Sequence, residues 1–481
     1  MFIDQDHLGE DCPVSRDGES RRRVRSGGAG KSSRRAIWIL LAALLCLAHT
    51  ESYALQGNIN SHDPSGLVKD GDRYYQFTTG DGIYSAYSTD LISWTSAPDR
   101  VFPIGTWPAW INTVVPGFRG NFWAPDVIQI NGRWYVYYAC STFGSSRSAI
   151  GVATSASLAG PWEDLGMVVS STSRGDVNAI DPGLFQDHSG RVYLTYGSFS
   201  GGIAVTEIDP LTAKLKSDAQ IVRVAGGGGA DYEAPYLTRE GPYYYLFVNR
   251  GFCCRGSNSS YYVQVGRSLT PFGPYEGWRT VLSSSGRYIG PGHVGIMHEN
   301  GVHYVSMHYY DAEDGGAPKL DILTLKYAGG WPSLTRDWIP AGQYQITNQH
   351  SGLVWDAWGC TGALGQMIAQ GSWANLICQK WYLAPQGDGI YRIANSLGGR
   401  STDIPNCAPD QGIGLQLWDG FNNNCQKFKL ERAADGSFVF TSLTGRRVVE
   451  VPGAATELGV QLRLSDYNGL DSQKWKITAA P

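Results

Sequence analysis

One interval recurs in the last third of this chain and limits what that part can fold into. Three tripeptides of the form Gln-Lys-aromatic are spaced 47 residues apart and begin at Gln379, Gln426 and Gln473. Three acidic residues keep the same interval: Asp356, Asp403 and Glu450. Three equal repeats fit a closed threefold β structure better than an open solenoid, because each repeat can bury its Trp or Phe against its neighbours.

The first two-thirds of the chain carry a looser repeat of five segments. Each segment reads as an apolar strand, a polar turn and a strand rich in aromatic residues. The turns are Asp70-Gly71, Asn131-Gly132, Ser189-Gly190, Glu240-Gly241 and Asn300-Gly301. Asn-Gly and Asp-Gly are typical hairpin turns, and hairpins that recur every ~50–60 residues are typical of propeller blades. The sequence therefore predicts a propeller of five blades.

Three of these segments open with an acidic residue, and a fourth opens with a histidine. The acids are Asp63, Asp181 and Glu233, and the histidine is His293. The innermost strands of a propeller line a central channel, so equivalent positions lie at one height around the axis. Three carboxylates are therefore expected to converge on one pocket. Acetal cleavage needs such groups, one to protonate the leaving oxygen and one to supply or activate a nucleophile. Crowding of like charges raises the pKa of one carboxyl group, which readies it as the acid.

The composition favours a neutral partner. A net charge of −4 and a pI near 6.1 exclude the basic footprint of a nucleic-acid-binding protein. The 61 Gly, 16 Trp and 27 Tyr residues fit strands joined by tight turns. Among the aromatic side chains, Trp123 and Phe143 offer flat faces for sugar rings, although each could equally pack inside the propeller.

The N-terminal segment has the pattern of a signal peptide. Basic residues between Arg16 and Arg35 precede an apolar run, Ala36–Ala48, that is too short to span a bilayer. Ser52-Tyr53-Ala54 is a suitable cleavage site, so residues 1–54 are predicted to be removed on export. The stretch from Ser33 to Trp38 also matches a twin-arginine signal, and an ordinary basic n-region is the alternative.

Export would permit disulfides. Seven of the nine cysteines remain after the predicted cleavage. Two cysteine pairs have the same spacing of 18 residues, Cys360 with Cys378 and Cys407 with Cys425. Cys253 and Cys254 are adjacent, which leaves Cys140 as an odd thiol that we expect to be buried.

The C-terminal repeats, from Gln343 to Ile477, resemble the ricin B-type β-trefoil, whose repeats end in Gln-x-Trp. The resemblance implies a sugar site built from an early acid, a Gln and an aromatic residue. The second repeat matches this pattern with Asp403, Gln416 and Trp418. The first repeat has Asp356 with Met367 and Ala369, and the third has Glu450 with Gln461 and Arg463. A sugar site is therefore expected in the second repeat alone, and a structural trefoil with no sugar site is the alternative.

Residues 58–331 resemble glycoside hydrolase family 43, and within it the endo-α-1,5-L-arabinanases. The resemblance is carried by a series of short stretches in the same order: His62-Asp63-Pro64-Ser65, Asn121-Phe122-Trp123-Ala124-Pro125-Asp126, Ser141-Thr142-Phe143-Gly144-Ser145, Asn178-Ala179-Ile180-Asp181-Pro182, Tyr196-Gly197-Ser198, Glu233-Ala234-Pro235-Tyr236, Cys253-Cys254-Arg255-Gly256 and Gly290-Pro291-Gly292-His293. We therefore expect an all-β chain, with a five-bladed β-propeller over residues 55–335 and a β-trefoil over residues 341–481.

This resemblance implies an inverting mechanism and a role for each acid. Asp63 would be the general base, Glu233 the general acid, and Asp181 would orient the substrate and tune the pKa of the acid. His293 would hold an ion, often calcium, largely through waters, although Val294 and Gly295 follow it where many relatives have Asn and Ser. The resemblance also implies a disulfide between Cys253 and Cys254 near the pocket. The candidate substrate-binding residues are Trp123, Phe143, Asn178 and Ser198.

The expected protein is thus a secreted hydrolase of arabinan or a related plant cell-wall polysaccharide. A monomer is expected, with no nucleic-acid partner and no membrane attachment after signal cleavage. Within the same fold, an exo-acting arabinanase, an α-L-arabinofuranosidase or a β-xylosidase is the alternative, because loop shape decides between them. A glycan-binding protein without catalysis is the alternative of another class, and the presence of all three acids argues against it.

Overall fold

The computed structural model describes residues 55–172, 177–299, 301–433 and 437–480, and within these ranges its regular secondary structure is almost entirely β-strand. One five-residue helix, α2 (Trp110–Val114), occurs in this described part. None of the helices described there is long and apolar enough to cross a membrane. The predicted signal peptide, residues 1–54, lies outside the described residues.

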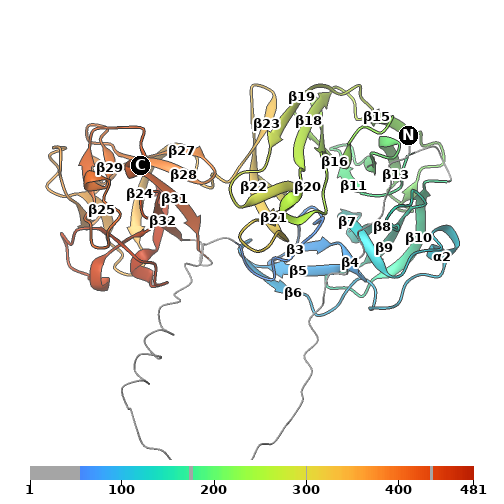
Figure 1. Ribbon diagram of the computed structural model, residues 1–481, viewed down its shortest axis with the longest axis horizontal. Coiled ribbons are helices and arrows are strands. Elements are labelled where there is room, and N and C mark those ends of the chain that lie inside the picture. Colours follow the sequence, from blue (N-terminus) through green and yellow to red (C-terminus); the bar gives the residue numbers. More distant parts are fainter. Residues whose placement is uncertain (1–54, 173–176, 300, 434–436, 481) are drawn as a thin grey trace, which may run out of the picture. The chain divides into compact units, whose positions relative to one another are not determined.

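The first part of the chain forms five separate sheets in sequence order (Figure 1). The first sheet contains β1 (Gln56–Gly57), β2 (Val68–Asp70), β3 (Arg73–Thr78), β5 (Tyr84–Ser88) and β6 (Ser93–Ser96). The second contains β4 (Gly80–Asp81), β7 (Asn121–Ile130), β8 (Arg133–Cys140), β9 (Ala149–Ser155) and β10 (Glu163–Ser170). The third contains β11 (Gly183–Gln186), β12 (Val192–Ser198), β13 (Gly202–Asp209), β14 (Lys214–Leu215) and β15 (Val222–Ala225).

The last two sheets have four strands each, paired in sequence order. The fourth sheet contains β16 (Glu233–Glu240), β17 (Tyr243–Arg250), β18 (Tyr262–Ser268) and β19 (Glu276–Leu282). The fifth contains β20 (Tyr288–Glu299), β21 (Val302–Asp311), β22 (Ala317–Ala328) and β23 (Trp331–Thr335). Five successive sheets, antiparallel except for the pairing of β1 with β6, confirm the predicted five-bladed propeller.

The blades form a closed ring. Strands near the start of successive blades contact one another, β3 with β7, β7 with β11, β11 with β16, and β16 with β20. The ring closes where the fifth blade meets the first: Ser306 Oγ donates to the Ser65 carbonyl oxygen at 2.7 Å, and Asn60 forms a β-bridge with Lys319. Closure of the ring leaves each blade with its own short edge strands, and it brings residues that are distant in sequence to a common centre.

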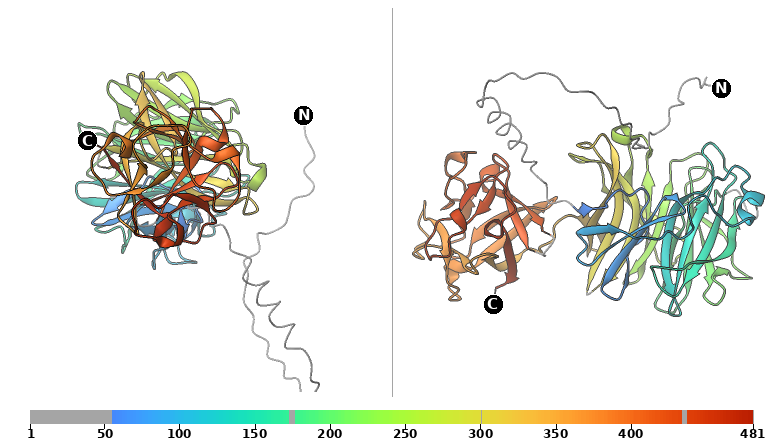
Figure 2. Two further views of the ribbon diagram at one scale, coloured as in Figure 1. Left: turned by 90° about the vertical axis from the view of Figure 1, so that its left-hand side faces the viewer. Right: turned by 90° about the horizontal axis from the view of Figure 1, so that it is seen from below.

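The remaining strands, β24 to β35, form one connected sheet system that Figure 2 shows in orange and red. Its strands are β24 (Gly342–Asn348), β25 (Val354–Ala357), β26 (Ile368–Gly371), β27 (Trp381–Gly387), β28 (Ile390–Asn395), β29 (Ser401–Asp403), β30 (Gln416–Trp418), β31 (Lys427–Arg432), β32 (Phe438–Ser442), β33 (Val448–Glu450), β34 (Arg463–Ser465) and β35 (Trp475–Ala479). A single core cluster buries the aromatic residue of every Gln-Lys-aromatic repeat, Trp381, Phe428 and Trp475. The predicted β-trefoil is confirmed.

The recurring Gln and acid of this β-trefoil bond to each other in the structure. Each buried Gln donates its side-chain N–H to the acid 23 residues before it: Gln379 to Asp356 at 2.8 Å, Gln426 to Asp403 at 3.0 Å and Gln473 to Glu450 at 3.1 Å. Buried polar groups need such partners. The repeat therefore has a structural reason that is independent of any ligand.

The strand register corrects the predicted positions in two of the three trefoil repeats. Asp403 pairs with Gln416 as expected, whereas Asp356 pairs with Ala369 and Glu450 pairs with Arg463. The residues equivalent to Gln416 are therefore Ala369 and Arg463 rather than Met367 and Gln461. The positions equivalent to Trp418 are accordingly Gly371 and Ser465 rather than Ala369 and Arg463, so both of these repeats lack the aromatic residue.

Three disulfides are present among the described residues: Cys253–Cys254, Cys360–Cys378 and Cys407–Cys425. Cys140 is a free thiol inside the second blade, where it is fully buried. These cysteine positions agree with the spacing in the sequence and with the resemblance.

Candidate active site

Five unusual backbone turns build the centre of the propeller. The φ angle is positive at Asp63 (49°), Ala124 (42°), Asp181 (55°), Ala234 (47°) and His293 (61°), one residue in each blade. Proline follows four of these residues. Positive φ is uncommon outside glycine and costs ~1–3 kcal/mol, and such strain concentrates at functional sites. Each turn changes the direction of its strand, so that side chains at or beside the turn lie at the centre of the propeller.

These turns also correct the expected alignment of the three acids. Asp63 and Asp181 occupy equivalent positions, but the equivalent residue of the fourth blade is Ala234. Glu233 lies one residue earlier, where the pairing of β16 with β17 shifts register between Glu233 and Tyr236. The longer side chain of Glu233 therefore approaches the centre from a different backbone position.

Histidines and a threonine hold the Asp63 carboxylate. Oδ2 accepts hydrogen bonds from His62 Nδ1 at 2.8 Å and from Thr79 Oγ1 at 3.0 Å. Oδ1 lies 3.5 Å from the Nδ1 atoms of both His293 and His308, and the Asp63 backbone N–H donates to His308 Nδ1 at 3.1 Å. Burial disfavours the charge, but the three histidines outweigh burial and hold the pKa of Asp63 well below its usual range. Asp63 is thus an ionised carboxylate.

The other two acids behave in the opposite way. Burial raises the pKa of Glu233 to about 7; Asp63 and Asp231 add to the increase, and a hydrogen bond from the Tyr261 hydroxyl opposes it. Burial also raises the pKa of Asp181 well above its usual range, and the carboxyl groups of Glu233 and Asp63 contribute. Asp181 Oδ2 accepts a hydrogen bond from the Ala234 backbone N–H at 3.1 Å.

One ionised and two protonated carboxyl groups can therefore coexist at neutral pH. The carboxylates that raise the pKa of Glu233 are Asp63 and Asp231. The role of Asp181 in tuning that pKa stays a prediction. Carboxyl groups whose environments push their pKa values apart are the usual mark of paired acid and base roles.

The propeller matches the family description "Glycosyl hydrolases family 43" over residues 57–332. The chain belongs to this family. The description "Ricin-type beta-trefoil lectin domain-like" matches residues 333–418. This match includes the first part of the β-trefoil of this family 43 hydrolase.

Curated relatives and solved structures agree with the family. An extracellular exo-α-(1→5)-L-arabinofuranosidase of Cellvibrio japonicus is 38% identical over 62% of this chain and 92% of its own length. An extracellular endo-α-(1→5)-L-arabinanase of Bacillus subtilis is 39% identical over 56% of this chain and 87% of its own. The structure of a Cellvibrio cellulosa α-L-arabinanase complexed with arabinohexaose is 35% identical, covers 58% of this chain and 96% of its own, and has a TM-score of 0.54.

The expected substrate-binding residues of this family 43 enzyme form two pairs. Trp123 and Phe143 have ring centroids 5.2 Å apart, and the Phe143 side chain is 85% exposed. Asn178 donates to Ser198 Oγ at 3.1 Å, and Asn178 also lines a polar cavity of about 560 Å³. Exposed aromatic faces and convergent polar groups suit a carbohydrate.

A group of side chains that could hold a metal ion lies beside the acids. It consists of His62, Asp63 and His308, whose ligand atoms lie within 4.8 Å of one another. His293 was the expected ion residue and is not in this group, although its Nδ1 atom is 3.5 Å from Asp63. Calcium prefers six to eight oxygen ligands, while this group offers one carboxylate and two imidazoles. These side chains therefore do not fit a directly bound calcium ion.

Several groups that hold the acids in place are not marked by any pattern in the sequence. Tyr261 donates to Glu233, and Tyr310 Oη lies 2.8 Å from His62 Nε2. Both tyrosines are among many in aromatic strands, so composition could not single them out. Of these groups, only His62 could have been suggested by the sequence, because it directly precedes the predicted base Asp63.

In the β-trefoil, the second repeat keeps a complete sugar-binding pattern. Gln416 Nε2 donates to Asp403 Oδ2 at 2.8 Å, and the neighbouring Trp418 side chain is 37% exposed. In the third repeat, Arg463 Nε donates to Glu450 at 3.0 Å, in the place that Gln416 takes in the second. The sugar site at Asp403, Gln416 and Trp418 stays a prediction.

Proposed function

We propose that this family 43 enzyme is an inverting endo-hydrolase of α-1,5-arabinofuranosidic linkages in arabinan. The observation that carries the proposal is the contrast between Asp63, which is ionised among three histidines, and Glu233, whose pKa is raised to about 7. The names of the relatives, which are arabinan-cleaving enzymes, support the choice of substrate. The Cellvibrio relative named as exo-acting favours exo action as the second candidate.

In this mechanism Asp63 accepts a proton from a water molecule, which attacks the anomeric carbon. Glu233 gives its proton to the leaving oxygen, so that the C–O bond breaks without releasing an alkoxide. Asp181 keeps its proton, and its carboxyl group orients a sugar hydroxyl beside Glu233. Trp123 and Phe143 offer faces for sugar rings, and Asn178 and Ser198 offer hydrogen bonds.

Hydrolysis of debranched arabinan is expected to give a ladder of oligosaccharides at early times, with the inverted anomer formed first. An attacking water from the face opposite the leaving group inverts an α-linkage to a β-product. Chromatography of the products and NMR of the first anomer measure both features. A single short product from the outset would favour exo action, and an initial α-anomer would contradict the roles of Asp63 and Glu233.

The same proposal gives a function to each segment of the chain. Residues 55–335 are the catalytic domain, residues 341–481 are the carbohydrate-binding domain, and residues 1–54 are a signal peptide that directs secretion. The extracellular names of several relatives support secretion. The three disulfides are consistent with an oxidising compartment.

For the ion near His293, the proposal is a calcium ion that is held through water molecules and not by direct protein ligands. Chelation of the purified enzyme is then expected to lower both the melting temperature and turnover, and added calcium to restore them. His293→Ala should lower both and abolish the response to chelator, because His293 faces Asp63. Differential scanning calorimetry and initial rates measure the effect. Full activity and an unchanged melting temperature in chelator would show that His293 has only a structural role.

The β-trefoil is proposed to bind the polymer through its second repeat. Trp418→Ala in the full chain is expected to weaken binding to insoluble arabinan while hydrolysis of short soluble oligosaccharides continues at the normal rate. Tethering raises the local concentration of enzyme on the polymer, and only a polymer offers that gain. Pull-down on insoluble arabinan and rates on both substrates measure it.

A matched control for this prediction is Trp358→Ala in the first repeat. Trp358 is 40% exposed, against 37% for Trp418, but its repeat lacks the Gln of the pattern. Equal losses from the two variants would contradict a specific site at Asp403, Gln416 and Trp418.

A further inference from the structure

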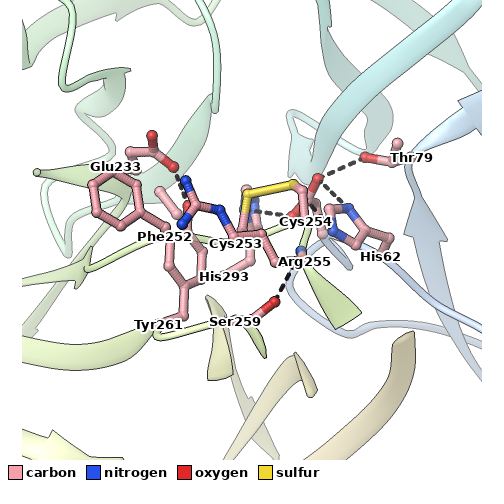
Figure 3. The surroundings of a disulfide bond; sticks show 12 residues. His62, Thr79, Glu233, Phe252, Cys253, Cys254, Arg255, Ser259, Tyr261 and His293 are labelled. Carbon is pink, nitrogen blue, oxygen red and sulfur yellow. Dashed lines mark hydrogen bonds and ion pairs between the residues drawn. A yellow bond between two sulfur atoms is a disulfide. The ribbon is translucent and has the colours of Figure 1, made fainter. Parts of the chain in front are cut away.

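A short loop contacts the proposed acid Glu233 directly and is linked to the proposed base Asp63 through two intervening side chains. It runs from Gly251 to Tyr261 and contains the Cys253–Cys254 disulfide. At its end, the Tyr261 hydroxyl donates to Glu233. At its tip, the Cys254 backbone N–H donates to Tyr310 Oη at 2.7 Å. In the view of Figure 3 the disulfide lies between Glu233 and His62.

From the tip of this loop, hydrogen bonds continue to the base. Tyr310 Oη lies 2.8 Å from His62 Nε2, and His62 Nδ1 lies 2.8 Å from Asp63 Oδ2. Because Tyr310 accepts the Cys254 N–H, its own proton can be donated to His62 Nε2. The imidazole then carries its proton on Nδ1, which donates to Asp63. The partner of one imidazole nitrogen commonly fixes what the other nitrogen does.

The disulfide itself holds the donor in place. Cys254 has a φ of 64°, a conformation that a residue with a Cβ atom keeps only when its surroundings impose it. Its Sγ atom lies 3.8 Å from His62 Nε2, so the sulfur also packs against the imidazole. Reduction would separate the two sulfurs and release this turn, and the Cys254 N–H would leave Tyr310.

We propose that the Cys253–Cys254 disulfide and Tyr310 position the base Asp63 through His62, so that reduction by a dithiol reversibly lowers hydrolysis. The inference rests on the proposed role of Asp63. In the reducing step one thiolate of the dithiol attacks a cysteine sulfur and forms a mixed disulfide, which releases the other cysteine. The second thiol of the reagent then attacks the reagent's sulfur in the mixed disulfide and releases the first cysteine. Two electrons and two protons pass to the protein, which gains two thiols, and the dithiol leaves as a cyclic disulfide.

The side chains favour selective reduction of this disulfide. Cys254 is exposed and its partner Cys253 is half-buried, whereas each disulfide of the β-trefoil joins one exposed cysteine, Cys360 or Cys407, to a buried one, Cys378 or Cys425. Access governs the rate of thiol–disulfide exchange. A brief treatment with dithiothreitol should therefore open the loop disulfide first, and labelling of new thiols with peptide mapping identifies which cysteines have reacted.

The test is a kinetic comparison of the full chain before reduction, after reduction and after reoxidation, on a soluble arabino-oligosaccharide. Reduction is expected to lower kcat about 10–100-fold, the usual size for groups that orient an imidazole, with KM within about twofold. Reoxidation should restore kcat. Cys253→Ser/Cys254→Ser should have the low kcat permanently and no further response to dithiothreitol. Tyr310→Phe should lower kcat similarly, while the neighbouring Tyr309→Phe should not.

Specific outcomes would overturn the inference. Unchanged kcat in protein whose Cys253 and Cys254 are both labelled would do so, and so would a normal kcat for Tyr310→Phe. An equal loss in the double serine variant on reduction would place the effect in the β-trefoil disulfides. A change confined to KM would mean that the loop binds substrate instead. Absence of hydrolysis by the untreated wild type would instead refute the proposed function.

Discussion

Asp63→Asn is expected to lower kcat by about 10²–10⁴-fold, the usual contribution of a general base, with the melting temperature nearly unchanged. Three histidines hold the pKa of Asp63 far below its usual range, so the wild-type group is a carboxylate throughout the working pH range. An asparagine side chain has the same shape and can keep a hydrogen bond to Thr79, but it cannot take a proton from water. Initial rates on an arabino-oligosaccharide and calorimetry measure the two quantities.

The control for this variant is another buried carboxylate. Asp187 accepts hydrogen bonds from the backbone N–H groups of Ser189 and Arg191, in the turn between β11 and β12. Asp187→Asn is expected to lower the melting temperature and to leave kcat within about twofold of wild type, the reverse of Asp63→Asn, because it is a structural group. Asp63→Asn with near-normal kcat would mean that another group activates the water.

The sequence predicted the trefoil repeat but not its strand register. The interval of 47 residues gave the fold, because each repeat places one aromatic residue in the shared core. The predicted equivalents of Gln416 and Trp418 in the other repeats lay two residues too early in the chain. The error arose because Gln461 is of the same residue type as Gln416, whereas the true equivalent is Arg463. A shift of two residues keeps every side chain on the same face of a strand. The alternation of polar and apolar residues therefore could not reveal it.

The sequence likewise predicted which residues lie at the centre of the propeller better than it predicted the side chains that contact them. Proline after Asp63 and Asp181 marked the strained turns, and the structure has both residues at positive φ. Glu233 precedes Ala234 and Pro235, whereas Asp63 and Asp181 each directly precede a proline, so the offset of one residue is visible in the sequence. The prediction that the three acids are equivalent was wrong on this point. Tyr310 of the fifth blade contacts His62 at the start of the first, and Tyr261 reaches Glu233 from 28 residues away within the fourth blade. Neither contact leaves a pattern in the local sequence.

The second large effect is expected at the acid. Glu233→Gln should lower kcat on arabino-oligosaccharides by about 10²–10⁴-fold, because a glutamine cannot protonate the leaving sugar oxygen. In the wild type, activity should fall as pH rises through about 7, since the pKa of Glu233 is raised to about 7 and only its protonated form is the acid. Tyr261 donates to the ionised form and lowers this pKa. Tyr261→Phe should therefore move the alkaline limb of the pH profile to higher pH.

The nature of the leaving group separates loss of an acid from general damage to the site. A substrate with an acidic phenol as leaving group needs little protonation, so Glu233→Gln should lose far less activity on an aryl arabino-oligoside than on arabinan. Glu240→Gln is the matched control, because Glu240 ends the same strand, β16, and is exposed; it should behave as wild type on both substrates. An equal loss by Glu233→Gln on both substrates would contradict proton donation and would leave Glu233 with a binding role.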